Sequence, residues 1–385
     1  MPHTRHLPLS PSSLGTTRTL TVHRFGTAGA RPKVYLQAGL HADELPGLVV
    51  MQALLDRLLT AEQDGLIGGE VVVVPVANPI GLDQHFQGQL LGRFETATGH
   101  NFNRRHLDPV DALIRRAVPL LGPDPETNVA ATRAILREEW LSAGGEDPHG
   151  RSEGDHLRHL LYGLAFDADL VLDLHCDWEA VMHTYTSTAS WPATDGVMRL
   201  LGAEAILIAT ESGGNPFDEA LSLPWVRLAE AAGADRPVPM GCHSMTVELR
   251  GQTDISDALA TADADALMAV LAHWGAVSGP QPTLPPARCT ATPLEAVDMV
   301  SAPSAGIVVY SGAVGDRVNA GDCLGWVVNP LGSDGLSGSR IPFHAATDGI
   351  IYGRLLQRLV RPGDTICKVA GDQPLAHRTG NLLTA

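Results

Sequence analysis

Apolar runs that alternate with a helix-forming segment constrain the fold of the first part of this chain. Residues 33–38 (KVYLQA) form a largely apolar run that ends at Gly39, and a second run, EVVVVPVA, covers residues 70–77. Between them, Pro46-Gly47 opens a segment whose apolar residues recur at helical spacing. Proline suits the first turn of a helix, because its missing N–H would have no partner there. This order of strand, helix and strand predicts a mostly parallel sheet covered by helices.

Three later apolar runs, at residues 168–175, 203–209 and 244–249, predict further strands of the same sheet. The region 106–165 has a different pattern, with two helical segments and a polar, glycine-rich loop. We therefore expect a helical excursion over the sheet in that region.

A proline-rich stretch divides the chain into two parts whose sequence patterns differ. We predict a catalytic α/β domain over residues 1–280, a linker over 281–289 and a small all-β domain over 290–385. In the last part, Ala302-x-x-x-Gly306 is echoed by Ala345-x-x-x-Gly349, and each motif is followed later by a Gly-Asp pair. This weak repeat predicts two similar β units packed as a sandwich.

Charge and composition exclude several classes of partner. The net charge is 27 − 43 = −16, and no basic run is present, so nucleic acid is not expected to bind. No apolar run approaches the roughly 20 residues that span a bilayer, and the N-terminus lacks the apolar stretch of a secretory signal. Five scattered cysteines without a Cys-x-x-Cys pair favour reduced thiols and the cytoplasm. A homo-oligomer would be ordinary for a chain of this size.

Polar side chains at the ends of the predicted strands supply the ligands of a metal site. His41 and Glu44 follow the first strand with a spacing that lets both side chains face one ion. A chain with sixteen histidines contains such a pair by chance, so the pair alone is weak. His175 ends a buried strand, where Asp173 or Asp177 would fix its tautomer. The alternative is a core histidine beside a surface aspartate.

Two more motifs carry a base and an anion-binding pair. Glu248 lies within an apolar strand, where burial raises the pKa of a carboxyl and suits it to general-base work on a metal-bound water. The alternative is an edge-strand glutamate paired with Arg250, two residues on. Asn103 and Arg104 place an amide beside a guanidinium, which suits a substrate carboxylate, although a loop arginine with surface contacts is also possible for such a sequence.

In their order along the chain, H-x-x-E, N-F-N-R, D-L-H and T-V-E resemble the zinc carboxypeptidase-like superfamily. The closest similarity is to its succinylglutamate desuccinylase and aspartoacylase branch, over roughly residues 30–275. The family pattern Gly-x-His-x-x-Glu matches Gly39-Leu-His41-Ala-Asp-Glu44. The resemblance implies a carboxypeptidase-like mixed sheet, mostly parallel and flanked by helices, followed by a small barrel-sandwich-like β-domain.

The resemblance also implies roles for the motif residues. His41, Glu44 and His175 would bind one zinc ion per chain, and Glu248 would act as general base and then as proton donor. Asn103 and Arg104 match the family pair that holds a substrate carboxylate or steadies the oxyanion. The C-terminal part resembles a biotinyl/lipoyl-type barrel, but residues 301–360 contain no lysine to carry either group. We therefore expect the C-terminal part to form a wall of the active site instead.

The chain departs from the family pattern at positions where the substrate is expected to bind. Arg105-His106 follows the Asn-Arg pair where a Phe-Pro-Gly type of turn is common, and Arg250 stands where a small residue is common. The substrates of the named relatives are therefore not transferred.

We predict a zinc-dependent amidohydrolase that deacylates an N-acyl amino acid or a similar small, carboxylate-bearing molecule. Glu248 and Arg104 would be catalytic, and Asn103, Arg104, Arg93 and Arg250 would bind substrate. The alternatives are a metallocarboxypeptidase acting on short or modified peptides and a non-catalytic binding protein on the same scaffold. Two histidines and one carboxylate also suit divalent metals other than zinc.

Overall fold

The larger part of the molecule is built on a single sheet. The computed structural model describes residues 2–331 and 338–383, and nine strands of this part of the chain form the sheet. In spatial order they are β1 (His3–Pro8), β2 (Thr19–Gly26), β4 (Glu70–Val74), β3 (Lys33–Ala38), β7 (Leu170–Asp177), β11 (His243–Gly251), β9 (His183–Ser187), β10 (Ala205–Ala209) and β12 (Ala291–Pro293).

Most neighbours in this sheet run parallel, as the sequence predicts. The pairs β4–β3, β3–β7, β7–β11, β9–β10 and β10–β12 are parallel, whereas β1–β2, β2–β4 and β11–β9 are antiparallel. Every residue of β3 and β4 is buried, which explains why their sequences are apolar runs without alternation. The mixed, mostly parallel sheet is therefore confirmed.

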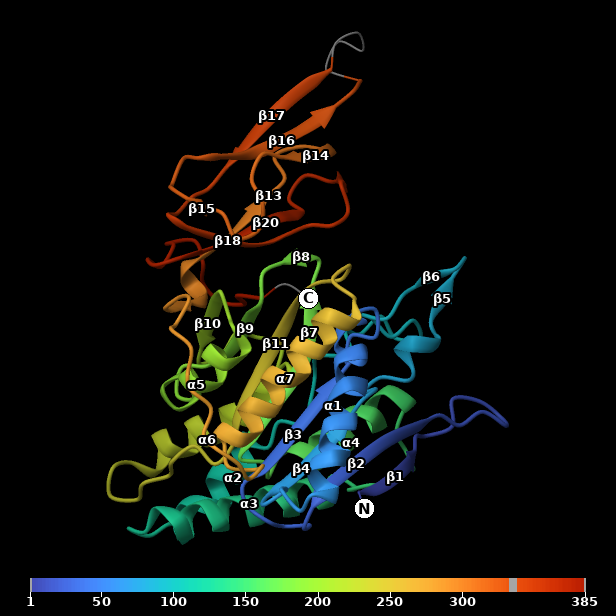
Figure 1. Cartoon of the computed structure of the whole chain (residues 1–385), viewed down its shortest axis with the longest axis vertical. Helices are drawn as coiled ribbons and strands as arrows, with labels where there is room; N and C mark the ends of the chain where they lie inside the picture. The colour runs from blue at the N-terminus through green and yellow to red at the C-terminus, as the bar shows by residue number, and fades with distance from the viewer. Residues whose placement is uncertain (1, 332–337, 384–385) are drawn as a thin grey trace.

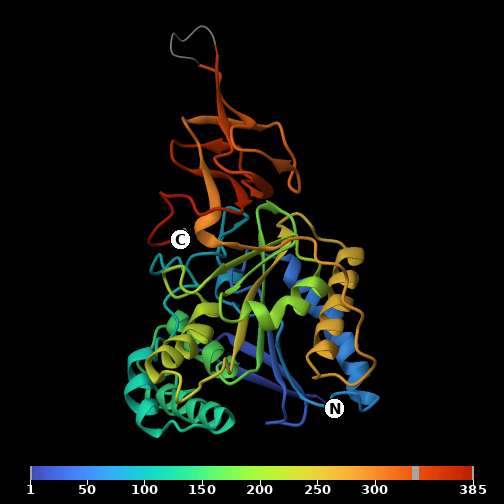
Figure 2. The same ribbon diagram turned by 90° about the vertical axis from the view of Figure 1, so that its left-hand side faces the viewer.

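Helices cover both faces of the sheet. The helices α1 (Pro46–Gln63), α5 (Trp191–Leu201) and α7 (Asp257–His273) pack on one face, where their apolar side chains meet Val34 and Leu36 of β3. The other face is covered by α2 (Val110–Ala117), α3 (Pro125–Ser142), α4 (Glu153–Ala165) and α6 (Phe217–Ala232), which enclose Tyr35. Figure 2 shows the two helical layers on either side of the sheet. The helices α2, α3 and α4 lie in the region 106–165, where the sequence predicts a helical excursion.

Short elements complete this part of the chain. A two-stranded ribbon of β5 (His85–Phe86) and β6 (Gln89–Leu90) projects from it, as Figure 1 shows. The 3₁₀ turns are η1 (Gly81–Asp83), η2 (Val118–Leu120) and η3 (Leu294–Ala296). In the described part of the chain, no helix has the length and apolar character needed to cross a membrane.

Two small antiparallel sheets form the C-terminal region, drawn in orange and red in Figure 1. One contains β13 (Val297–Ser301), β20 (Thr365–Gly371), β18 (Gly349–Arg354) and β15 (Arg317–Val318), and β8 (Glu179–Ala180) pairs with its β18. The other contains β17 (Ser339–His344), β16 (Cys323–Asn329), β14 (Gly306–Tyr310) and β19 (Leu359–Val360). A separate apolar cluster that includes Val327 and Ile366 fills the space between them.

The internal repeat of the sequence has a structural counterpart in reciprocal backbone hydrogen bonds. The N–H of Ala302 donates to the carbonyl of Asp364, and the N–H of Ala345 donates to that of Asp322, at 2.8 and 3.0 Å. Each alanine thus contacts the Gly-Asp turn that follows the other repeat. This exchange explains why the motif recurs, because each unit needs the turn of its partner.

The small sheets are joined to the large one close to the carboxyl ends of the central strands. The pairing of β8 with β18 attaches them to the segment that directly follows β7, and Glu179 of β8 accepts hydrogen bonds from Arg354 and Arg358 at 2.6 and 2.7 Å. The chain reaches them through β12, which still belongs to the large sheet. Figure 1 shows the small sheets above β7, β8 and β9.

Candidate active site

Three neighbouring strands bring the polar motifs together. His41 and Glu44 lie in the turn between β3 and α1, His175 lies near the end of β7, and Glu248 lies in β11. The three strands are adjacent in the order β3, β7, β11, and the Cα of Glu248 is paired in register with that of His175. Gly39 has a φ of +72°, a left-handed conformation that turns the chain sharply after β3. The motifs therefore meet at one edge of the sheet, where open α/β sheets bind ligands.

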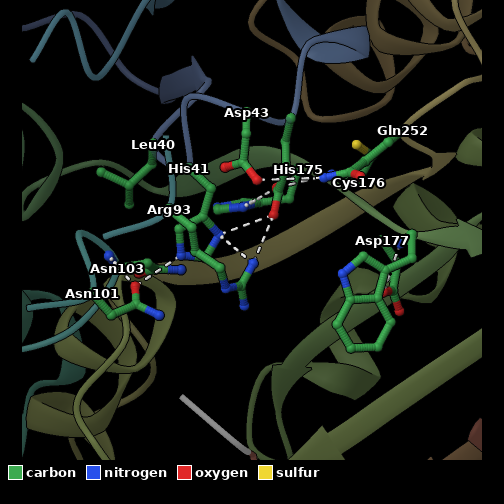
Figure 3. A network of polar contacts seen from close by, with 12 residues as sticks. Leu40, His41, Asp43, Arg93, Asn101, Asn103, His175, Cys176, Asp177 and Gln252 are labelled. Carbon is green, nitrogen blue, oxygen red and sulfur yellow. Dashed lines mark hydrogen bonds and ion pairs between the residues drawn. The ribbon is translucent and has the colours of Figure 1, made fainter. Parts of the chain in front are cut away.

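The side chains of His41, Glu44 and His175 converge on one point. One ligand atom from each of the three lies within 4.8 Å of the other two, and all three residues are buried. Glu44 Oε1 is 3.0 Å from Nδ1 of His41, and its Oε2 is 2.8 Å from Nδ1 of His175. Figure 3 shows His41 and His175 in the same network of polar contacts, and their ring centres are 5.0 Å apart. The structure brings together all three residues predicted to hold the metal.

Hydrogen bonds behind the two imidazoles determine their tautomers. The N–H of Asn103 donates to Oδ1 of Asn101, which identifies that atom as the oxygen, and His41 Nε2 lies 2.8 Å from it. His175 Nε2 lies 2.8 Å from the carboxylate of Asp173. Because both neighbours are acceptors, each Nε2 carries a proton, and each Nδ1 is the atom directed at the point of convergence. Burial opposes the protonation of His175, but the carboxylates of Asp173 and Glu44 raise its pKa well above the usual value, so a cation bound here would displace the proton on its Nδ1. Two such nitrogens and a carboxylate suit a zinc ion with an open fourth position.

The charges around this point favour a bound cation. Burial opposes the ionisation of Glu44, but His41 and His175 overcome it and hold the pKa of this carboxyl well below its usual range. Burial, together with the charge of Arg93, lowers the pKa of His41 to about 4, so its imidazole is neutral near pH 7. A neutral imidazole and an ionised carboxylate are the forms that bind metals.

Glu248 faces the same pocket from a central strand. The strand β11 lies between β7 and β9, so the alternative of an edge-strand glutamate does not hold. Burial, and then the charge of Glu44, raises the pKa of Glu248 to about 8. Within the described residues its Oε2 is buried and has no hydrogen-bond partner. This carboxyl is thus placed and tuned to exchange a proton with a molecule in the pocket.

Asn103 and Arg104 also line this pocket. Asn103 Oδ1 accepts a hydrogen bond of 2.8 Å from the N–H of Phe217 at the start of α6, so its Nδ2 is the amide atom available to a substrate. Arg104 donates from Nη1 to the carbonyl of Asn103 at 2.7 Å. Gly214, with a φ of +80°, packs against this arginine, and a Cβ there would lie 2.8 Å from Arg104 Cδ. The loop before α6 therefore holds Arg104 in place.

The two other predicted arginines have different positions. Arg93 lines the pocket, and its Nη1 donates to Glu44 Oε1 at 3.0 Å. Arg250 is not among the lining residues, because it binds Asp263 of α7 with its two terminal nitrogens at 3.2 and 2.5 Å. The strand β11 bulges between Glu248 and Gly251, and Arg250 has a φ of +65°, which breaks the alternation that the sequence suggests. The structure therefore gives no support to a substrate-binding role for Arg250.

Several lining residues were not anticipated from the sequence. The pocket has a volume of about 170 Å³, and its wall includes Met299, Tyr352 and Lys368 of the small sheets. Lys368 Nζ lies 2.5 Å from Asp177 and 4.8 Å from the ring centre of Trp178. It is one of only two lysines in the chain, a rarity that could have marked it. The small sheets thus form part of the pocket wall.

Comparisons with known proteins agree with this site. Residues 30–274 match the model of the succinylglutamate desuccinylase/aspartoacylase catalytic domain. Two solved structures are similar over the whole fold, and both come from proteins described as succinylglutamate desuccinylase/aspartoacylase. The protein from Shewanella frigidimarina is 25% identical, with a TM-score of 0.81 over 96% of this chain and 97% of its own. The protein from Shewanella amazonensis is 29% identical, with a TM-score of 0.80 over 96% and 98%.

The ectoine utilization protein EutE from Ruegeria pomeroyi, at 18% identity and a TM-score of 0.65, shares the fold over 97% of this chain and 98% of its own. No curated protein matches the chain. The family match covers more than half of the sequence and includes His41, Glu44, His175 and Glu248. The chain therefore belongs to the succinylglutamate desuccinylase/aspartoacylase family.

Proposed function

We propose that this protein is a zinc-dependent amidohydrolase that removes the acyl group from an N-acyl amino acid or a similar small molecule with a carboxylate. The observation that carries the proposal is the convergence of His41, Glu44 and His175 on one point. The same pocket contains Glu248, whose buried Oε2 has no hydrogen-bond partner among the described residues. Membership of a deacylase family supports the reaction class.

The two Nδ1 atoms and the carboxylate of Glu44 would hold the metal. A zinc ion bound there would polarise the amide carbonyl and lower the pKa of a water molecule. Asp173 and Asn101 keep both imidazoles in the tautomer that this binding needs. One ion per chain is expected, because the described residues form a single such cluster.

Glu248 would move the proton. In its ionised form it takes a proton from the attacking water, and in its protonated form it delivers that proton to the nitrogen of the leaving amine. Its raised pKa suits both steps, because a carboxyl that titrates near neutral pH releases a proton as easily as it accepts one.

The amide of Asn103 and the guanidinium of Arg104 would hold the substrate carboxylate or the developing oxyanion, since both line the pocket beside the metal ligands. Arg93 is a second candidate for the oxyanion, because its Nη1 already contacts Glu44 at 3.0 Å. A pocket of about 170 Å³ is smaller than the roughly 300–1,000 Å³ of sites for drug-sized ligands. This size, and the wall of small sheets, favour a small molecule over a peptide.

Metal analysis of the purified protein, followed by assays for free amine, tests the proposal. We expect about one zinc per chain and amine release from at least one member of a panel of N-acetyl, N-succinyl, N-formyl and N-aroyl amino acids. Release of C-terminal residues from short peptides instead would identify a carboxypeptidase. Tight binding of these ligands without turnover, unchanged in Glu248→Ala, would identify a binding protein.

A further inference from the structure

A second cavity lies at the edge of the large sheet opposite to the catalytic pocket. It has a volume of about 270 Å³, and its wall includes Lys33, the first residue of β3, and the last turns of α3. Because β3 has six residues and rises about 3.3 Å per residue, roughly 20 Å separates this edge from the metal-ligand candidates. Figure 1 shows α3 at the end of the molecule opposite to the small sheets. A ligand in this cavity would therefore not touch the catalytic groups.

Positive side chains gather at this cavity although the chain as a whole is acidic. The net charge of the chain is −16, yet four of its 27 lysine and arginine residues line this one cavity. They come from four different elements, namely Arg5 of β1, Arg24 of β2, Lys33 of β3 and Arg137 of α3. The large sheet and the helical layer on its face thus bring together cations that are far apart in the sequence.

The cavity wall contains one acidic side chain fewer than it contains cations. Its acids are all engaged in ion pairs, which are Arg5–Glu146 at 2.8 Å, Arg24–Glu70 at 3.0 Å and Lys33–Asp167. Arg137 is exposed and has no hydrogen-bond or ion-pair partner among residues 2–331 and 338–383. Its guanidinium therefore presents N–H donors for which this part of the protein supplies no acceptor.

The ammonium group of Lys33 also has a donor left over. This side chain is only 7% exposed, and its Nζ donates to the carbonyl of Leu164 at 2.9 Å and to the carboxylate of Asp167. An ammonium group has three N–H donors, so one remains without an acceptor among these contacts. Leaving a buried charged donor unpaired is costly, and Lys33 lines the cavity. An acceptor oxygen inside the cavity would satisfy it.

We propose that this cavity is a second ligand site, which binds a phosphate group, either as inorganic phosphate or as part of a phosphomonoester. Guanidinium groups bind phosphate oxygens through paired N–H donors, and a lysine adds a point charge. A phosphate directs its oxygens in several directions, which suits donors that reach the cavity from four elements, whereas the two oxygens of a carboxylate lie in one plane. The site is independent of the metal centre, so it goes beyond the proposed deacylase function.

Calorimetric titration of the purified protein with inorganic phosphate, glycerol 3-phosphate and succinate tests this site. Arg137→Gln should weaken the binding of phosphate by about 10-fold, because it removes charge-assisted hydrogen bonds. Arg115→Gln is the matched control, since Arg115 is an exposed arginine of α2 without a partner in the described part of the chain, and it should leave the affinity unchanged. Glu146→Gln releases Arg5 from its ion pair and should strengthen the binding by about threefold or more.

Opposite changes of affinity in Arg137→Gln and Glu146→Gln would support the site, because an anion bound at the metal centre would respond to neither substitution. Phosphate should also raise the melting temperature of the wild type more than that of Arg137→Gln. Equal affinities for the two phosphate compounds would identify the free ion as a sufficient ligand, and tighter binding of glycerol 3-phosphate would identify a phosphomonoester. Absence of binding at millimolar phosphate, an unchanged affinity in both variants, or tighter binding of succinate would overturn the proposal. None of these outcomes depends on deacylation.

Discussion

The proposed metal centre and the wall of the pocket at the start of α6 are built in opposite ways. At the metal centre, both imidazoles have an acceptor behind them, and Glu44 contacts both rings and the N–H of Cys176. On the wall, the buried Oε2 of Glu219 has no hydrogen-bond partner within the described residues, and the Asp218 carboxyl interacts with the neighbouring N–H of Glu219. The first arrangement is complete in the protein itself, whereas the second is left for a ligand to complete. The difference indicates that the proposed metal ligands are held in place before a ligand binds, whereas specificity depends on side chains of the wall that a ligand would contact.

The largest effect on activity is expected from removal of a proposed metal ligand. His41→Ala should abolish metal binding and reduce deacylation below detection, because two remaining ligands cannot hold the ion in an ordered geometry. Metal content and amine release are the measurements, and chelated wild-type protein that regains activity on adding zinc is the control. Full activity in metal-free protein would contradict the proposed chemistry.

Replacement of the base should separate metal binding from turnover. Glu248→Gln should lower kcat by about 10²- to 10⁴-fold, because the amide cannot accept the proton of the attacking water. Metal content should stay equal to that of the wild type, since Glu248 is not among the three clustered ligands. An active Glu248→Gln variant would show that another group acts as base.

Substitution of a residue that accepts a hydrogen bond from an imidazole should have an intermediate effect on metal affinity. Asp173→Asn should weaken metal affinity by about 10- to 100-fold, because the orientation and basicity of His175 depend on the carboxylate at Nε2. Competition with a chromophoric chelator measures this affinity. The matched control is Asp263→Asn, a buried aspartate that binds Arg250 outside the pocket, and it should leave metal affinity unchanged.

The buried carboxyl of Asp218 predicts a pH dependence of the free energy of unfolding. The folded pKa of Asp218, about 7, lies above its ordinary value of 3.8, so its contribution to the free energy of unfolding is fully present below pH 3.8 and is lost as the pH rises through 7. Urea unfolding at several pH values measures this loss, on the order of 2–4 kcal/mol before any compensating relaxation. In Asp218→Asn this component should be absent. Identical pH profiles of the two proteins would contradict the raised pKa of this buried carboxyl.

The smallest effect is expected for Arg250. Arg250→Ala should leave kcat/KM within about twofold of the wild type, because its guanidinium binds Asp263 and does not line the pocket. Loss of this ion pair should lower the free energy of unfolding by about 1 kcal/mol. A large rise in KM would restore the substrate-binding role that the sequence suggests.

The sequence predicts the metal centre better than the wall because the two are encoded differently. His41, Glu44, His175 and Glu248 each follow or end a recognisable apolar strand, and parallel strands bring their carboxyl ends to one edge of a sheet. Arg250, two residues after Glu248, would lie on the same face of a regular strand, but a bulge in β11 interrupts the alternation there. A local sequence pattern therefore predicts which side chains share a face only where the backbone keeps a regular strand geometry.

The rest of the site depends on contacts between distant parts of the chain. The strand β9 (HTYTS) is almost entirely buried although it is polar, because hydroxyls such as that of Thr186 find backbone acceptors, and a search for apolar runs cannot find it. Lys368 and Asp218 reach the pocket only after the small sheets dock and α6 packs. Asp218 has no local signal that distinguishes it from a surface charge, and Lys368 is marked only by the rarity of lysine in this chain.

The pairing of β8 with β18 restricts how molecules enter the pocket. The small sheets share main-chain hydrogen bonds with the segment that leaves the strand of His175, and the N–H of Val181 also donates to the carbonyl of Tyr352 at 3.0 Å. A hinged opening would have to break these bonds and expose the apolar contacts beneath them. We therefore expect ligands to enter and leave while the small sheets keep their place over the pocket.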